Sequence, residues 1–184
     1  ACWLLLKMGI TGNRLLDKSL NWIVKRQRDD GGWLHRLHID KKQDYDSHPS
    51  CIWTTAEVMQ SLSLRRAFIP REVAEKGINF LLDNALMDNK STFFSNVNTW
   101  DKLSIGSGDD SMFYGGTLKV IETAERFGCH PGKRQFKKLY DWLLGQEMAT
   151  GYFPKNADKM PLKDENVTVR ALILIWNVES SRPN

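Results

Sequence analysis

Apolar residues recur along this chain at helical spacing, and two kinds of helical segment alternate. In the first kind, one face is apolar and the other is charged. Leu16, Leu20 and Ile23 share one face of the first such segment, whereas Lys18 and Lys25 lie on the opposite face. The second kind is represented by "VRALILIW" near the C-terminus. It is apolar nearly all round, which predicts burial on every side.

The two kinds of segment form an internal repeat. Aromatic residues at matching positions mark the amphipathic segments, at intervals of 58 and 62 residues: Trp22, Phe80 and Trp142. A threonine marks each of the last three apolar segments, at intervals of 62 and 51 residues: Thr55, Thr117 and Thr168. The opening "ACWLLLKMG" aligns with "AEVMQSLSL" and adds one more apolar segment.

This alternation predicts an all-α fold of about seven helices in stacked hairpins, with amphipathic helices outside and apolar helices inside. We expect residues 1–184 to form a single repeat domain. Because the chain opens within an apolar helix, we expect it to be part of a longer protein. The outer helices are expected near 14–28, 71–86 and 133–147, and the inner helices near 1–8, 54–66, 115–127 and 166–178.

The segment "QRDDGGW", residues 27–33, ends the first amphipathic helix. Gly31 is expected to supply the left-handed residue that stops the helix, and Gly32 to let the following backbone pass close to a neighbour. Gln27 is expected to bond backbone groups of the adjacent repeat. Trp33 would then lie over that junction as a large apolar lid.

A degenerate copy, "QEMATGYF", follows the third amphipathic segment and gives Gln146, Gly151 and Phe153 matching roles. The middle copy matches only in its first half, since Ala85 stands where a glutamine is expected. Together with Trp22, this pattern resembles the glutamine–tryptophan repeat of squalene–hopene and oxidosqualene cyclases. The resemblance implies the α/α toroid shared by terpenoid cyclases and protein prenyltransferase β subunits. A chain of this length would form part of such a toroid.

The long connections that follow the amphipathic helices contain two groups of candidate chemical residues. Terpenoid cyclases start their reaction with an Asp-x-Asp-Asp motif, in which neighbouring carboxylates keep one acid protonated. The segment "SGDDS" offers Asp109 and Asp110 as candidate catalytic residues, but Ser107 replaces the leading aspartate. The alternative for this pair is a helix-capping or loop role.

Prenyltransferase β subunits bind zinc through Asp, Cys and His, and Asp46, His48 and Cys51 are the corresponding residue types here. Their spacing differs from the family's Asp-x-Cys, and no fourth ligand is evident, so we expect no bound metal. Zinc remains the alternative. Two further alternatives are a Cys51 nucleophile paired with His48, and a buried, unreactive Cys51 beneath Trp53.

Composition limits the class of protein and its surroundings. Hydrophobic residues make up 41% and charged residues 26% of the 184 residues, which is typical of a soluble globular protein. No apolar run is long enough to span a membrane. The three cysteines predict free thiols in the cytoplasm. The net charge of +4 is spread among acidic residues, which disfavours nucleic acid as a partner.

These observations favour a non-catalytic binding or scaffolding module over an enzyme. Curved stacks of helical hairpins bind peptides or neighbouring domains. The expected partner is another protein or the rest of a larger parent chain, and an apolar isoprenoid or lipid ligand is also compatible. The alternative is an isoprenoid cyclase or prenyltransferase-type enzyme, acid-initiated or zinc-dependent.

Overall fold

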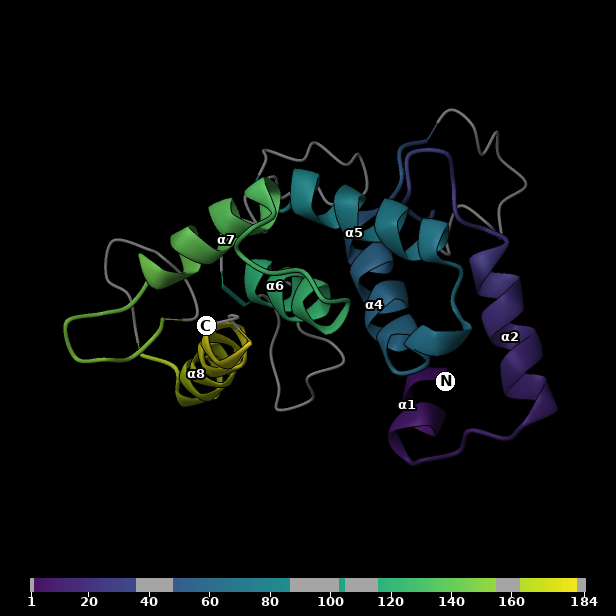
Figure 1. Ribbon diagram of the computed structural model, residues 1–184, viewed down its shortest axis with the longest axis horizontal. Helices are drawn as coiled ribbons and strands as arrows, with labels where there is room; N and C mark the ends of the chain where they lie inside the picture. Colours follow the sequence, from purple (N-terminus) through teal and green to yellow (C-terminus); the bar gives the residue numbers. More distant parts are fainter. Residues whose placement is uncertain (1, 36–47, 87–102, 105–115, 155–162, 182–184) are drawn as a thin grey trace. The chain divides into compact units, whose positions relative to one another are not determined.

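The computed structural model describes residues 2–35, 48–86, 103–104, 116–154 and 163–181 (Figure 1). Within these ranges the chain is all-α, with seven α-helices and no strand, as predicted. Every expected helix is present, and most are shorter than expected at their ends. In chain order the elements are α1 (Cys2–Lys7), α2 (Arg14–Val24), α4 (Ile52–Ser63), the 3-10 turn η2 (Arg66–Phe68), α5 (Arg71–Asn84), α6 (Thr117–Arg126), α7 (Arg134–Leu144) and α8 (Glu165–Ser180).

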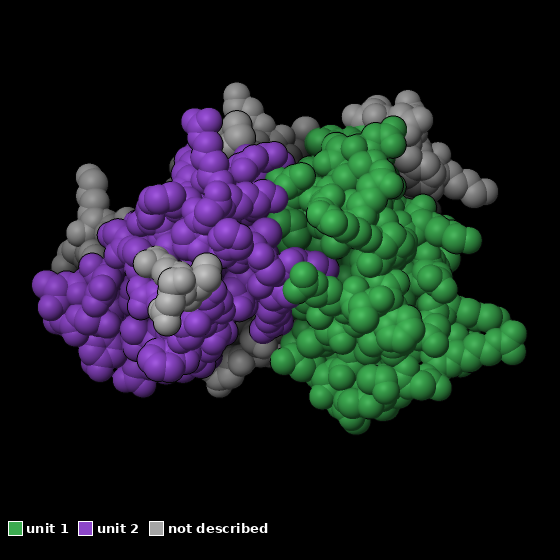
Figure 2. Space-filling view, viewed as in Figure 1, with its two compact units in different colours: residues 1–81, 91–95 green, residues 82–90, 96–184 purple. Residues whose placement is uncertain are grey.

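The chain divides into two compact units, coloured separately in Figure 2. The first unit comprises residues 1–81 with 91–95, and the second comprises 82–90 with 96–184. The boundary therefore falls within α5.

In the first unit, α1 packs against both α4 and α2. Helix α1 ends at Lys7, and the turn after it contains Gly9, whose φ of 78° lies in the left-handed region. The Gly9 and Ile10 amides donate to carbonyls of the preceding turn, which satisfies the end of the helix. Helix α2 begins after Asn13, whose side-chain oxygen accepts from the Leu15 and Leu16 amides.

Arg65, a buried arginine just after α4, contacts three other parts of this unit. The Arg65 guanidinium donates to the Thr11 carbonyl and forms an ion pair with Asp17 at 3.1 Å. It also lies 4.0 Å above the ring of Phe68 in η2. The Arg65 side chain thereby joins the segment between α1 and α2, helix α2 itself, and the turn that leads into α5.

In the second unit, α6 packs against α7 and α8. Helix α6 is buried along almost its whole length, including the charged Lys119. Between α6 and α8, the Arg170 guanidinium donates two bonds to the Glu122 carboxylate, at 2.9 and 2.7 Å. Both side chains are mostly buried, so this bidentate pair fixes the register of the two helices.

Helix α8 differs from the sequence-based expectation. Ala171, Leu174 and Val178 are buried, but the opposite side of the same helix is exposed. The prediction that this segment is buried on every side is therefore wrong. Its composition shows that all faces are apolar, whereas burial requires a neighbour on each face. By contrast, Ala56 and Met59 of α4 are fully buried, as expected for an inner helix.

Candidate binding surfaces

The "QRDDGGW" segment forms a tight junction between α2 and α5. Gly31 has a φ of +87°, and a Cβ atom at this position would lie 2.4 Å from the Lys76 carbonyl oxygen. A Cβ on Gly32 would instead lie 2.4 Å from the Ser50 side chain and 3.1 Å from the Phe80 ring. The close approach of two backbones therefore occurs at Gly31, not at Gly32 as predicted. Gly32 makes room for side chains.

Gln27 forms the expected bond to a neighbouring helix. Its Nε2 donates to the Val73 carbonyl, in the first turn of α5, at 2.9 Å, and to the Gly31 carbonyl at 3.0 Å. The side-chain amide thereby joins the end of one amphipathic helix to the start of the next.

Trp33 packs at this junction and is almost completely buried. Its indole Nε1 donates to the Ile23 carbonyl at 2.8 Å, and its backbone amide donates to Thr55 Oγ1 at 3.0 Å. The Trp33 carbonyl accepts from the Cys51 amide at 2.8 Å. The tryptophan therefore links α2 to the start of α4.

Asp30 has a role in this junction that sequence reasoning missed. Its Oδ1 accepts from the Gly32 amide at 2.9 Å and from Ser50 Oγ at 2.8 Å. An aspartate two residues before an amide that needs a partner is a familiar turn pattern. The bond from Ser50 could not be predicted, because a long connection separates Gly32 from Ser50 in the sequence.

The third copy repeats part of this geometry. Gly151 has a φ of +77°, and Phe153 is fully buried. The Phe153 amide donates to Thr168 Oγ1 at 2.9 Å, and the Phe153 carbonyl accepts from the Asp164 amide. These bonds match those of Trp33 with Thr55 and Cys51.

Gln146 does not occupy the position of Gln27. Its Nε2 donates to the Trp142 carbonyl of its own helix at 3.3 Å. The turn bonds of Met148 correspond to those of Arg28, so the residue that matches Gln27 is Glu147. The predicted correspondence is off by one residue.

Three of the candidate catalytic and metal-binding residues, Asp46, Asp109 and Asp110, lie outside the described residues. Of the others, Cys51 is buried at the start of α4, and the His48 carbonyl accepts from the Arg28 guanidinium at 2.9 Å. Within the described part of the chain, no group of three or more His, Cys, Asp or Glu side chains is placed to hold a metal ion. The zinc and acid sites stay predictions.

Helix α8 exposes a row of large apolar side chains, which we call the C-terminal apolar face: Val169, Leu172, Ile173 and Trp176. Each of the four is between 50% and 72% exposed. The repeat spacing matches Leu172 to Met59 in α4 and to Ile121 in α6, both of which are fully buried. Leu172 is therefore exposed at a position that the two earlier repeats bury.

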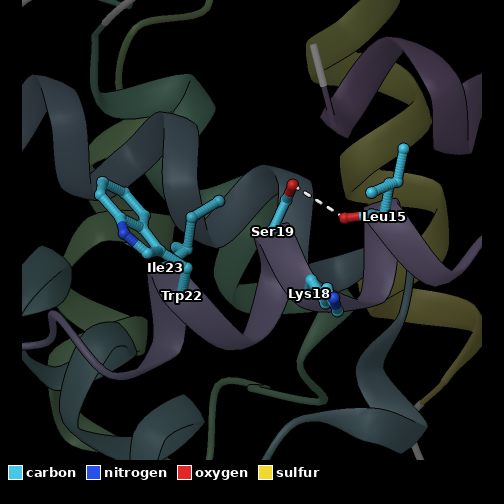
Figure 3. Close-up of a pocket in the computed structure, with 5 residues that line it drawn as sticks. All are labelled: Leu15, Lys18, Ser19, Trp22 and Ile23. Atoms are coloured by element: carbon cyan, nitrogen blue, oxygen red, sulfur yellow. Dashed lines mark hydrogen bonds between the residues drawn. The ribbon is translucent and has the colours of Figure 1, made fainter.

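Helix α2 carries a second open surface, a groove lined by Leu15, Lys18, Ser19, Trp22 and Ile23. Figure 3 shows Ser19 between Leu15 and the Trp22–Ile23 pair, with Ser19 Oγ donating to the Leu15 carbonyl at 2.9 Å. Leu15 is 71% and Trp22 50% exposed, and the Arg26 guanidinium lies 3.6 Å above the Trp22 ring. We call this surface the α2 groove.

Comparisons with known proteins add no assignment. No protein-family model, curated protein sequence or solved structure matches this chain. Among the described helices, none has the length and apolar character needed to cross a bilayer.

Proposed function

We propose that this chain is a binding or scaffolding module of helical repeats, which holds a protein partner against an open helix face. The observation that supports this proposal is the C-terminal apolar face of α8. Contiguous exposed apolar surface on a folded protein commonly marks an interaction site. Trp176 is the most exposed residue of this face, and tryptophan is among the residue types enriched in protein interfaces.

A protein partner fits this face better than a small apolar ligand. Ligand sites are concave and bury most of the surface of the ligand. The C-terminal apolar face belongs to one helix, and such a face is convex. An amphipathic helix laid along it would cover the row of side chains at helical spacing.

The first unit contains a model for such a partner. A Cβ atom on Gly77 of α5 would lie 2.5 Å from Met59 Sδ, so α5 packs closely against α4 at this point. Met59 is the residue that matches Leu172. The partner of α8 is therefore proposed to be an amphipathic helix with a small residue opposite Leu172. The three free cysteines favour the cytoplasm as the place of this association.

The test uses a peptide of residues 70–86, which contains the α5 sequence and no tryptophan. Titration of the whole chain with this peptide should shift its total tryptophan emission to shorter wavelength in a saturable manner, because the Trp176 indole leaves water. Leu172→Glu should abolish saturation. Leu144→Glu, at an exposed position on α7, is the matched control and should bind normally. Calorimetry with Trp176→Phe should still detect binding.

A peptide that produces no saturable signal up to its solubility limit would overturn the proposal. Equal binding by the Leu172→Glu and control variants would also overturn it, because the peptide would then bind elsewhere.

A further inference from the structure

We propose that helix α7 binds an acidic segment of a partner protein through a cluster of cations. We call this cluster the α7 basic face, and it consists of Lys133, Arg134, Lys137 and Lys138. Spacings of three and four residues place these side chains on one side of the helix. Three of them are exposed, and Lys133 is partly exposed. This inference goes beyond the proposed function, because it concerns another helix and another chemistry, and it does not depend on the C-terminal apolar face.

Positive charge is concentrated in this part of the chain. Residues 126–140 contain five Lys or Arg residues and no Asp or Glu. The net charge of the whole chain is +4, so the remaining residues taken together are close to neutral. The mixture of acidic and basic residues that characterises the chain as a whole is therefore absent from this segment.

The internal repeat shows which positions these cations occupy. The interval of 62 residues between Phe80 and Trp142 matches the α7 basic face to four residues of α5. In chain order they are Arg71, Glu72, Glu75 and Lys76. All four are exposed, although the chain has a repeat on either side of α5. The repeat itself therefore leaves these positions open to solvent.

The charges at these positions cancel in α5 but not in α7. Two ion pairs join the α5 residues, at 2.6 and 2.8 Å: Arg71–Glu75 and Glu72–Lys76. In α7 cations replace both glutamates, and Lys137 pairs with Asp141 at 2.5 Å. Like charges at this spacing repel one another, and cations are unfavourable near the start of a helix. The cluster therefore weakens α7, and a bound anionic partner would offset that repulsion.

An acidic protein segment fits this face better than a nucleic acid or a membrane. Residues 126–140 are all described, and none of their large apolar side chains is exposed. Sites for single-stranded nucleic acid combine cations with aromatic side chains on which bases stack. Stable attachment to a membrane surface needs apolar side chains or a lipid anchor beside the cations. Duplex DNA is bound through many phosphates along an extended surface, whereas these cations lie within residues 133–138 of one helix.

Fluorescence anisotropy of a fluorescein-labelled oligoglutamate peptide, titrated with the whole chain, tests the proposal. The peptide should bind in a saturable manner, and added salt should weaken binding, because it screens exposed charges. Arg134→Glu combined with Lys137→Glu gives α7 the charge pattern of α5. This double variant should lower the affinity about tenfold, because two attractive charges become repulsive. The i,i+4 pairs seen in α5 can then form, so the variant should remain folded.

Arg14→Glu combined with Lys18→Glu is the matched control. These two residues have the same types and spacing in α2 as Arg134 and Lys138 have in α7. The control lowers the net charge by the same amount and should bind the peptide like the wild type. Arg134→Gln combined with Lys138→Gln, which introduces no acid, is a second test and should also weaken binding. Circular dichroism spectra should match that of the wild type in all three double variants.

Absence of saturable binding at low salt would overturn the proposal. Equal losses in the α7 variants and the α2 control would also contradict it, because the effect would then depend only on net charge. Tighter binding of a DNA oligonucleotide, or of vesicles that contain phosphatidylserine, through the same α7 residues would refute an acidic protein segment as the partner. These substitutions leave α8 unchanged, so none of these results decides whether the C-terminal apolar face binds a helix.

Discussion

The first and third copies of the glutamine–glycine–aromatic segment share their inner bonds and differ in their outer ones. In both copies the amide of a buried aromatic residue, Trp33 or Phe153, donates to a threonine of the following helix. Only in the first of these two copies does a glycine, Gly31, lie against the backbone of a neighbouring amphipathic helix, near Lys76. A Cβ on Gly151 would meet nothing within 4 Å.

This difference separates two functions of the segment. The aromatic–threonine part closes a single repeat, so it is kept wherever an apolar helix follows. The glutamine–glycine part joins one amphipathic helix to the next. In the third copy no further amphipathic helix contacts it within the described residues, and the bond of Gln146 turns back into its own helix.

The largest expected effect concerns the buried aromatic residue that both copies share. Trp33→Ala and Phe153→Ala should each lower the free energy of unfolding by about 3–5 kcal/mol, because both remove a buried aromatic side chain and leave a cavity. Denaturant unfolding of the two variants measures this. A small loss for Phe153→Ala beside a large one for Trp33→Ala would show that the third copy does not close its repeat in the same way.

The next effect separates the two glycines. Gly151→Ala should cost about 1–2 kcal/mol, because its positive φ is unfavourable for a residue with a Cβ. Gly31→Ala carries the same cost and must also displace the Lys76 backbone, which adds about 1–3 kcal/mol. The difference between the two unfolding free energies is the quantity to measure. Equal losses would contradict the close approach at Gly31.

The smallest effect concerns the glutamines. Gln27→Ala removes two bonds to backbone carbonyls, each worth about 0.5–1.5 kcal/mol, and should destabilise the protein by about 1–2 kcal/mol. Gln146→Ala should change the free energy of unfolding by less than about 0.5 kcal/mol, as surface substitutions commonly do. Comparable losses in the two variants would mean that Gln146 has a partner outside its own helix.

Much of the fold could be predicted from the sequence, because helical periodicity and the repeat are local properties of the chain. They located all seven helices and placed Trp33 at the junction that Gln27 forms with the adjacent repeat. Features that depend on neighbours could not be predicted in this way. The segment "VRALILIW" has the composition of a buried helix, yet Leu172 and Trp176 are exposed.

In the junction around Gln27, too, some features could be predicted from the sequence and others depend on neighbouring elements. The pairing of Gln27 with a neighbouring helix could be predicted from the motif, whereas the exact partner, Val73, required the packing of α5. The predicted match of Gln146 to Gln27 was wrong because it rested on the shared glutamine. The turn bonds of Arg28 and Met148 match Gln27 to Glu147 instead. The role of Asp30 depends on Ser50, which is distant in the sequence.

The hydrogen bonds around the first junction also imply an order of events during folding. The Trp33 side chain reaches back 10 residues to Ile23, and its amide reaches forward 22 residues to Thr55, whereas Gln27 reaches 46 residues to Val73. Closing a longer loop costs more chain entropy, so we expect the Gln27–Val73 bond to form later in folding than the two bonds of Trp33. An interaction that forms late affects the unfolding rate and leaves the folding rate nearly unchanged. The Gln27–Val73 bond would then slow the separation of α2 from α5 during unfolding.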